Sequence, residues 1–167
     1  ETVVALCRLD LGTQQSADAS VYQWGGVIDV ALRHGLIGPL QSAVSKMHSV
    51  PDSLFSTIQS VHLNCAARNF QLLNALFEVL AAFREFGTEL CVLKGPAVAL
   101  LAYGQITTRE FTDLDLLIRH EDLDRAEGVL AQLGYLRANH VVGRFHSEKD
   151  IQFLRAADDV LVELHWA

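Results

Sequence analysis

Residues 93–118 read LKGPAVALLAYGQITTREFTDLDLLI. This stretch opens with a Lys-Gly-Pro turn and closes with Asp113 and Asp115, which stand one residue apart among leucines. In a β-strand, side chains at positions i and i+2 point to the same face, so we expect both carboxylates to project together. Two carboxylates so close repel each other, and a divalent cation such as Mg²⁺ removes that penalty. Taken alone, the pair also fits two solvated aspartates at a strand edge.

The residues before the aspartates predict a phosphate site. The Lys94-Gly95 turn joins an expected strand at 89–93 to an expected short helix at 97–103. Free backbone N–H groups at the start of a helix attract anions. Gly95 permits close approach of a phosphate, and Lys94 supplies a positive charge. Arg109, in the loop before the aspartates, is suited to bidentate contact with the same phosphates.

Apolar periodicity predicts a helical first half and a mixed second half. Helical spacing runs over residues 21–44, with breaks near Gly35 and Gly38-Pro39, and then from residue 52 to a helix end at Gly87. The later elements are expected as strand 89–93, helix 97–103, strand 114–118, helix 120–133, and strands 151–154 and 160–166. The fold class is therefore α+β, with a helical lobe at 1–86 and a compact α/β core at 87–167.

Composition narrows the class of protein. The chain has 167 residues, of which 50% are hydrophobic and 20% charged, so we expect a globular fold. The formal net charge of −7 argues against an extended nucleic-acid surface. Three widely spaced cysteines, an odd number without metal-type pairing, indicate reduced thiols and a cytoplasmic protein.

No apolar run is long enough for a membrane span. The chain begins without Met and stops after an apolar run, so we expect a truncated C-terminus.

The order of these features resembles the nucleotidyltransferase superfamily of the DNA polymerase β type. That pattern is an apolar strand, a Gly-containing turn, a short helix, a loop, and a strand reading hydrophobic-Asp-hydrophobic-Asp-hydrophobic; Thr112 stands at its first hydrophobic position. More narrowly, LKGPAVALLAYG, REFTDLDLLI, LVELHW and the earlier HGLIGPL are similar to the bacterial uncharacterised nucleotidyltransferase family. The resemblance covers most of residues 21–166. It implies a nucleotidyltransferase-like mixed β-sheet flanked by helices.

The resemblance also implies a third carboxylate on a neighbouring strand. Glu163 matches that place, and strand alternation puts His165 on the same face. Rival acids stand in expected turns or at strand ends, namely Glu148, Asp150, Asp158 and Asp159. The expected catalytic and metal-binding residues are Asp113, Asp115 and Glu163. The expected nucleotide-binding residues are Lys94, Gly95, Arg109 and His165.

For such a family member, the resemblance implies an NTP substrate such as ATP, Mg²⁺ or Mn²⁺ as cofactor, and two ions about 4 Å apart. The acceptor stays open between a small molecule, an RNA end and a protein, and no membrane partner is expected. Pro96 departs from the family's usual Gly-Gly or Gly-Ser turn, because it offers neither a hydroxyl nor an N–H. The alternative is therefore a catalytically weak or inactive nucleotide-binding or partner-binding module. A third hypothesis makes the helical lobe an interaction or antitoxin-like surface.

Overall fold

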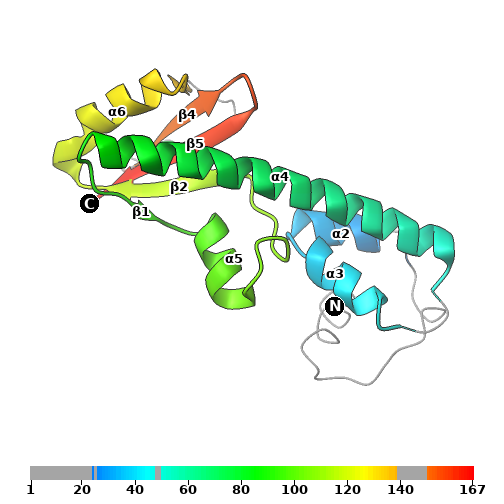
Figure 1. Cartoon of the computed structure of the whole chain (residues 1–167). Helices are drawn as coiled ribbons and strands as arrows, with labels where there is room; N and C mark the ends of the chain where they lie inside the picture. Colours follow the sequence, from blue (N-terminus) through cyan, green and yellow to red (C-terminus); the bar gives the residue numbers. More distant parts are fainter. Residues whose placement is uncertain (1–23, 25, 48–49, 139–149) are drawn as a thin grey trace. The chain divides into compact units, whose positions relative to one another are not determined.

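The computed structural model describes residues 24, 26–47, 50–138 and 150–167 (Figure 1). The chain divides into two compact units. The helical unit comprises Glu1–Asn69 and Tyr103–Phe111, and the sheet unit comprises Phe70–Ala102 and Thr112–Ala167. The long helix α4, Asp52–Glu85, contributes residues to both units. The division into domains 1–86 and 87–167 stays a prediction.

The helical unit is built from α2 (Val27–Arg33), α3 (Ile37–Val44) and the first half of α4. Gly35 separates α2 from α3 with a φ of +63°, a left-handed conformation that glycine adopts without strain. The break predicted at Gly38-Pro39 is wrong, because both residues lie in the first turn of α3. A proline is tolerated there, since its missing N–H has no helical partner. The core of the unit consists of Val27, Ala31, Ile37, Leu40, Ala43, Val44 and Ile58.

Helix α4 ends where the sequence predicts, just before Gly87. The helix stops at Glu85, and Gly87 follows with a φ of +66°. The Thr88 N–H donates to the Phe83 carbonyl over 2.9 Å, and the Gly87 N–H donates to the Arg84 carbonyl over 3.2 Å. These two bonds satisfy carbonyls that a helix end otherwise leaves unpaired.

The remaining elements confirm the predicted order with changes at their ends. In chain order they are β1 (Cys91–Val92), α5 (Gly95–Tyr103), β2 (Asp113–Ile118), a 3₁₀ helix (His120–Asp122), α6 (Leu123–Gln132), β3 (Leu136–Arg137), β4 (Asp150–Arg155) and β5 (Val160–Trp166). The strand expected at 89–93 is thus shorter, and the helix expected at 120–133 begins as a 3₁₀ turn. The short strand β3 was not predicted, because its two residues are exposed and carry no apolar alternation.

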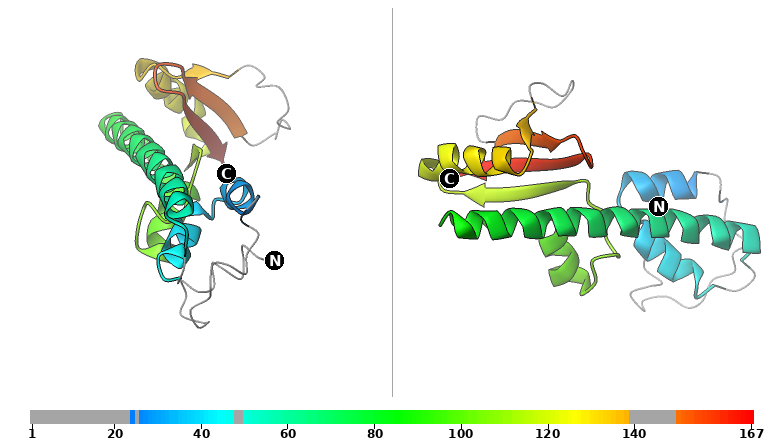
Figure 2. Two further views of the ribbon diagram at one scale, coloured as in Figure 1. Left: turned by 90° about the vertical axis from the view of Figure 1, so that its right-hand side faces the viewer. Right: turned by 45° about the horizontal axis from the view of Figure 1, so that its top comes forward.

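The five strands form one mixed sheet in the order β1-β2-β5-β4-β3 (Figure 2). Strands β2 and β5 are parallel, whereas the β1–β2, β5–β4 and β4–β3 pairs are antiparallel. The fold class is α+β, as predicted. Strand β5 lies in the centre of the sheet although it is the last of the five in the chain.

The two faces of β2 and β5 differ in polarity. Leu114, Leu116, Val162 and Leu164 alternate with the polar positions and have no solvent exposure. Burying a leucine fully stabilises a fold by roughly 2–3 kcal/mol, so these positions hold the two strands in place. Further buried residues of the unit come from α4 and α6, including Leu72, Leu76, Val79, Phe83, Ala126, Val129 and Leu130. The opposite face of these two strands carries the acidic side chains of Asp113, Asp115 and Glu163.

Two further findings concern the helices and the cysteines. Within the described ranges, none of the helices has both the length and the apolar character of a membrane span. Cys65, which is half-buried, and Cys91, which is exposed, are both free thiols. Cys7 lies outside the described residues.

Candidate functional site

Asp115 and Glu163 lie directly opposite each other on neighbouring parallel strands. The register of β2 and β5 pairs Asp115 with Glu163. Paired residues on adjacent strands present their side chains to the same face. Asp115 is 4% exposed, although a carboxylate is rarely buried so completely without a partner. The structure therefore brings together two of the three predicted acids.

His165 joins this pair from the same strand as Glu163. Its Nε2 atom lies 3.0 Å from Asp115 Oδ1 and 4.0 Å from Glu163 Oε2. One ligand atom from each of Asp115, Glu163 and His165 lies within 4.8 Å of the others, a spacing that fits a single metal ion. The sequence assigns His165 to nucleotide binding, whereas this geometry also makes its imidazole a candidate metal ligand.

Asp113 lies outside that three-residue group. It is paired in register with Leu161 and is half-buried at the start of β2. Its charge nevertheless helps to raise the pKa of Lys94, together with the larger effects of Asp115 and then Glu163. Asp113 therefore belongs to the same electrostatic environment, and its role as a metal ligand stays a prediction.

Lys94 reaches the acids from the turn between β1 and α5. Its Nζ atom donates to Asp115 Oδ1 over 3.1 Å. This hydrogen bond and the Asp115 charge raise the Lys94 pKa above its ordinary value. The Lys94 backbone has a φ of +34°, an uncommon conformation for a residue with a Cβ atom. Strained residues of this kind tend to occur at functional sites.

Gly95 is the first residue of α5 and is buried, again with a φ of +34°. The Lys94 carbonyl accepts the first helical hydrogen bond, from the Val98 N–H over 3.2 Å. The start of α5 therefore lies directly after the lysine that contacts the acids. Pro96, the second residue of the helix, provides no N–H there.

Gln152 was missed by the sequence analysis. Its Nε2 atom donates to Glu163 Oε1 over 2.7 Å, and the two residues are paired in register across β4 and β5. Alternation along 151–154 gives the face of each residue, but the facing residue depends on strand register. No signal in the sequence would have identified this contact.

Arg109 belongs to the helical unit. The Asn69 side chain donates to the carbonyls of Ile106 and Arg109 over 2.7 and 2.9 Å, which fixes the loop that carries the arginine. The same loop passes close to Gly38, where a Cβ atom would come within 2.4 Å of the Thr108 carbonyl oxygen. Arg109 Nη1 is buried and has no hydrogen-bond partner in the described ranges. Its predicted contact with phosphates stays a prediction.

Of the rival acids, Asp158 and Asp159 lie in the turn between β4 and β5, whereas Asp150 shares a face of the sheet with His165. Asp158 accepts hydrogen bonds from Arg155 over 2.9 and 2.8 Å, in the turn between β4 and β5. Asp159 occupies a left-handed turn position with a φ of +57°. Asp150 is paired in register with His165 at the start of β4. Glu148 lies outside the described residues.

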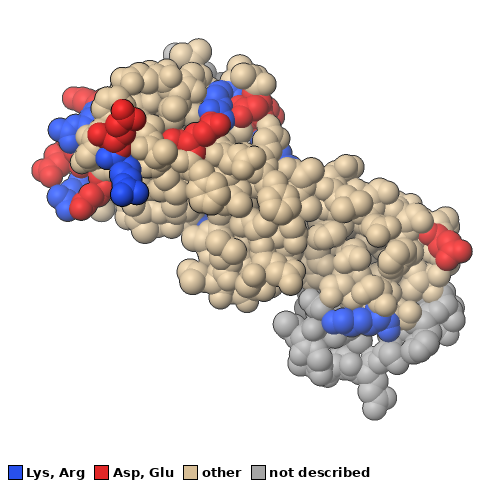
Figure 3. All heavy atoms as spheres, viewed as in Figure 1, with Lys and Arg blue, Asp and Glu red and all other residues tan. Residues whose placement is uncertain are grey.

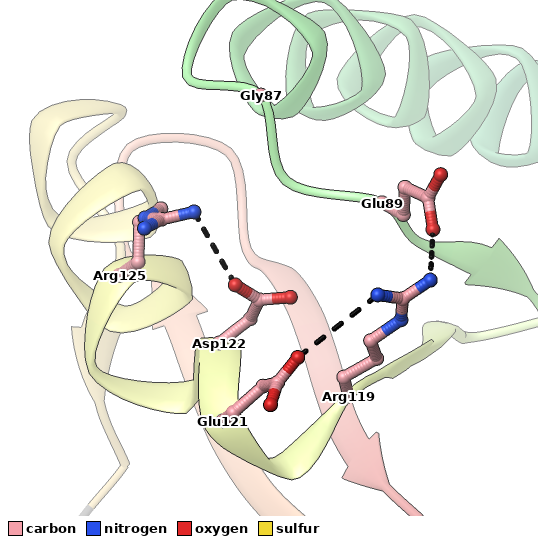
Figure 4. A pocket seen from close by; sticks show the side chains of 6 residues that line it. All are labelled: Gly87, Glu89, Arg119, Glu121, Asp122 and Arg125. Atoms are coloured by element: carbon pink, nitrogen blue, oxygen red, sulfur yellow. Dashed lines mark hydrogen bonds and ion pairs between the residues drawn. The ribbon is translucent and has the colours of Figure 1, made fainter.

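A separate hollow of about 520 Å³ lies beside the end of β2 (Figure 4). It is lined by Gly87, Glu89, Arg119, Glu121, Asp122 and Arg125. Arg119 is paired with Glu89 at 2.7 Å, and Arg125 is paired with Asp122 at 3.3 Å. None of the predicted site residues lines it. On the face drawn in Figure 3, basic and acidic side chains are interspersed, without a broad basic surface.

Two solved structures are similar to this chain, the crystal structure of ANT(2″)-Ia in complex with adenylyl-2″-tobramycin and the solution structure of the antibiotic-resistance factor ANT(2″)-Ia. Sequence identity is 22% and 21%, the TM-score is 0.47 for both, and the matches cover 59% of this chain and 50% and 49% of those chains. The chain thus spans about half the length of either protein.

No curated protein matches the chain in sequence. Residues 20–167, however, match the family described as uncharacterised nucleotidyltransferase. The match includes Lys94, both aspartates of β2 and Glu163 on β5. The chain therefore belongs to the uncharacterised nucleotidyltransferase family.

Proposed function

We propose that this chain carries the catalytic core of a metal-dependent nucleotidyltransferase, which transfers a nucleoside monophosphate from an NTP to an acceptor hydroxyl. The observation that carries the proposal is the pairing of Asp115 with Glu163 across parallel strands, with His165 beside both. ATP is the NTP to test first. The acceptor is a small molecule, an RNA end or a protein, in a cytoplasmic setting that suits free thiols.

The donor set supports a divalent metal. Two carboxylates and one imidazole offer oxygen and nitrogen ligands within 4.8 Å of one another, and Asp115 is buried. Mg²⁺ prefers oxygen ligands, while Mn²⁺ also accepts imidazole. Asp115, Glu163 and His165 would hold the ion, and Asp113 at the start of β2 would hold a second one. Such ions offset phosphate charge and make an acceptor hydroxyl more acidic when bound.

The transfer step itself would involve a general base and positively charged contacts to the phosphates. The acceptor oxygen forms a bond to the α-phosphorus of the NTP, and the bond from that phosphorus to pyrophosphate breaks. The hydroxyl proton goes to a carboxylate, for which Glu163 is the candidate base. Lys94 is mostly exposed at its side chain (64%), so its ammonium is accessible to a triphosphate. Gly95 and Arg109 are proposed as further phosphate contacts.

The test is pyrophosphate release from each labelled NTP, with Mg²⁺ or Mn²⁺ and a pool of acceptors. We expect metal-dependent release by the wild type. Asp115→Asn should lower the rate by about 100-fold or more, because a neutral amide holds a divalent ion less well than a carboxylate does. Asp124→Asn, which removes an exposed acid on α6, is the matched control and should leave the rate unchanged.

Two outcomes would contradict the proposal. Release that persists in the double variant Asp113→Asn/Asp115→Asn would exclude these acids as the site. Equal release with and without EDTA would exclude the metal.

A nucleotide-binding or partner-binding module is the second candidate, and three observations favour it. Pro96 removes one N–H from the start of α5, and the Lys94 ammonium already contacts Asp115. In addition, Phe70 and Phe77 are 51% and 58% exposed on the same side of α4. Exposing two large apolar side chains to water is unfavourable unless a partner covers them. Metal-dependent NTP binding without pyrophosphate release from any acceptor would support this candidate over the enzyme.

A further inference from the structure

The side chain of Gln152 contacts Glu163 on the polar face of the sheet. We propose that Gln152 is a positioning residue, which fixes the carboxylate of Glu163 so that one chosen oxygen faces Asp115 and His165. This inference rests on the proposed function, because Glu163 matters only if the site binds a metal. Gln152 itself is not a ligand in this proposal and touches no reacting atom.

The strand register makes the contact specific. Gln152 on β4 and Glu163 on β5 are direct partners in an antiparallel pair, so their side chains stand next to each other on one face. The Gln152 Nε2 atom donates to Glu163 Oε1 over 2.7 Å, a short distance typical of bonds to a charged acceptor. The opposite amide orientation would place a carbonyl oxygen against a carboxylate, so the chemistry selects the donor.

The two oxygens of Glu163 thereby acquire different surroundings. Oε1 accepts the amide hydrogen bond, and Oε2 lies 4.0 Å from His165 Nε2. The Glu163 side chain is 12% exposed, so little water is present to compete for either oxygen. Gln152 therefore orients Oε2 toward the group formed by Asp115 and His165.

This arrangement has a measurable consequence for metal binding. Ligands held in place by a neighbouring hydrogen bond lose less freedom when they bind an ion, and loss of such a neighbour typically weakens metal affinity by about 10- to 100-fold. We expect Gln152→Met, which keeps the length of the side chain without its donor, to weaken binding of Mn²⁺ by about 10-fold. Gln152→Leu serves as a second variant without a donor and should give the same result.

The probe is Mn²⁺ alone, titrated into the whole chain and followed by the electron paramagnetic resonance signal of free Mn²⁺. The matched control is Gln71→Met. Gln71 Nε2 also donates a single partly buried hydrogen bond, over 2.8 Å to the Asp158 carbonyl oxygen in the same unit. This control should lose a comparable amount of thermal stability and keep the wild-type Mn²⁺ affinity. Circular dichroism establishes that each variant is folded.

The outcomes separate this inference from the proposed function. The positioning role is supported if both Gln152 variants bind Mn²⁺ more weakly than the wild type while Gln71→Met keeps the wild-type affinity. Equal Mn²⁺ affinity in wild type and both Gln152 variants overturns it and leaves the proposed metal site standing. Equal weakening in Gln71→Met overturns it as well, because a general loss of stability would then explain the result. A wild type that binds no Mn²⁺ overturns both the metal site and the role of Gln152.

Discussion

Lys94 donates a hydrogen bond to Asp115 over 3.1 Å from a backbone that has a φ of +34°. The same carboxylate oxygen lies 3.0 Å from His165 Nε2. The buried acid is therefore stabilised by two nitrogen groups of the chain itself. A triphosphate would offer the Lys94 ammonium a second anionic partner, so this lysine connects the acids to the proposed nucleotide.

Lys94→Met should lower the rate of pyrophosphate release by about 100-fold, because one charge that stabilises the transferring group is lost. The variant should also lose stability, because loss of the ammonium leaves the buried carboxylate of Asp115 with one hydrogen-bond donor fewer. Lys94→Gly should be equally inactive and should melt above Lys94→Met, because glycine adopts a positive φ without strain. Rates and thermal melting measure the two effects separately. Equal rates in wild type and both variants would remove Lys94 from the site.

His165→Gln distinguishes two roles for this histidine. If the imidazole is a metal ligand, the ratio of Mn²⁺ affinity to Mg²⁺ affinity should be about 10-fold lower in the variant, because imidazole binds Mn²⁺ more readily than Mg²⁺. Competition of Mg²⁺ against bound Mn²⁺ measures this preference, with His120→Gln as the control at an exposed position. An unchanged preference with weaker NTP binding would instead support the nucleotide-binding role predicted from the sequence.

Gly38→Ala tests the close approach within the helical unit. The added methyl group would meet the Thr108 carbonyl oxygen at 2.4 Å, and backbone atoms yield little. We expect a loss of about 1–3 kcal/mol, as for other overpacked positions. Gly128→Ala is the matched control, because a Cβ atom there meets nothing within 4 Å. Alanine should raise stability at that helical position by up to about 1 kcal/mol. If both variants melt alike, the close contact has no energetic importance.

His62 predicts a dependence of stability on pH. Burial lowers the pKa of His62 from its ordinary value of 6.5, and its Nδ1 atom is buried without a hydrogen-bond partner in the described ranges. The unfolded state therefore takes up the proton first as the pH falls below 6.5. Stability is complete above that pH and declines as the pH falls toward the folded-state pKa, by under about 1 kcal/mol because the side chain is partly exposed.

His62→Gln should remove this part of the decline, and His34→Gln, at an exposed position of the same unit, should not. Denaturant unfolding at pH 7.5 and pH 5 measures the difference. Identical declines in wild type and His62→Gln would assign the acid sensitivity to other groups.

Much of the fold could be predicted because local patterns determine it. The alternation of Asp113 and Asp115 with leucines identified both the strand and its polar face, and Gly87 identified the end of α4. The break predicted at Gly38-Pro39 was wrong because the first turn of a helix tolerates proline. Such a turn and a loop look alike in sequence until the neighbouring helix is known.

The candidate site was less predictable, because it depends on contacts between distant segments. Alternation gives the faces of Glu163 and Gln152, but not that each lies opposite a particular residue of another strand. The resemblance to a family, not the residue pattern, implied that Glu163 joins the aspartates. Gln152 has no such support in the sequence, and only the register of β4 and β5 identifies it.

The central position of β5 has a consequence for how the protein is made. Asp115 and His165 are 50 residues apart in the chain, and β5 must insert between β2 and β4. A nascent chain that has emerged only as far as β4 therefore has Asp115 without His165 and Glu163, and it has two strands with unpaired edges. Such edges favour aggregation, and distant pairings form slowly. We therefore expect ribosome-bound intermediates to depend on chaperones until the Val160–Trp166 segment is released.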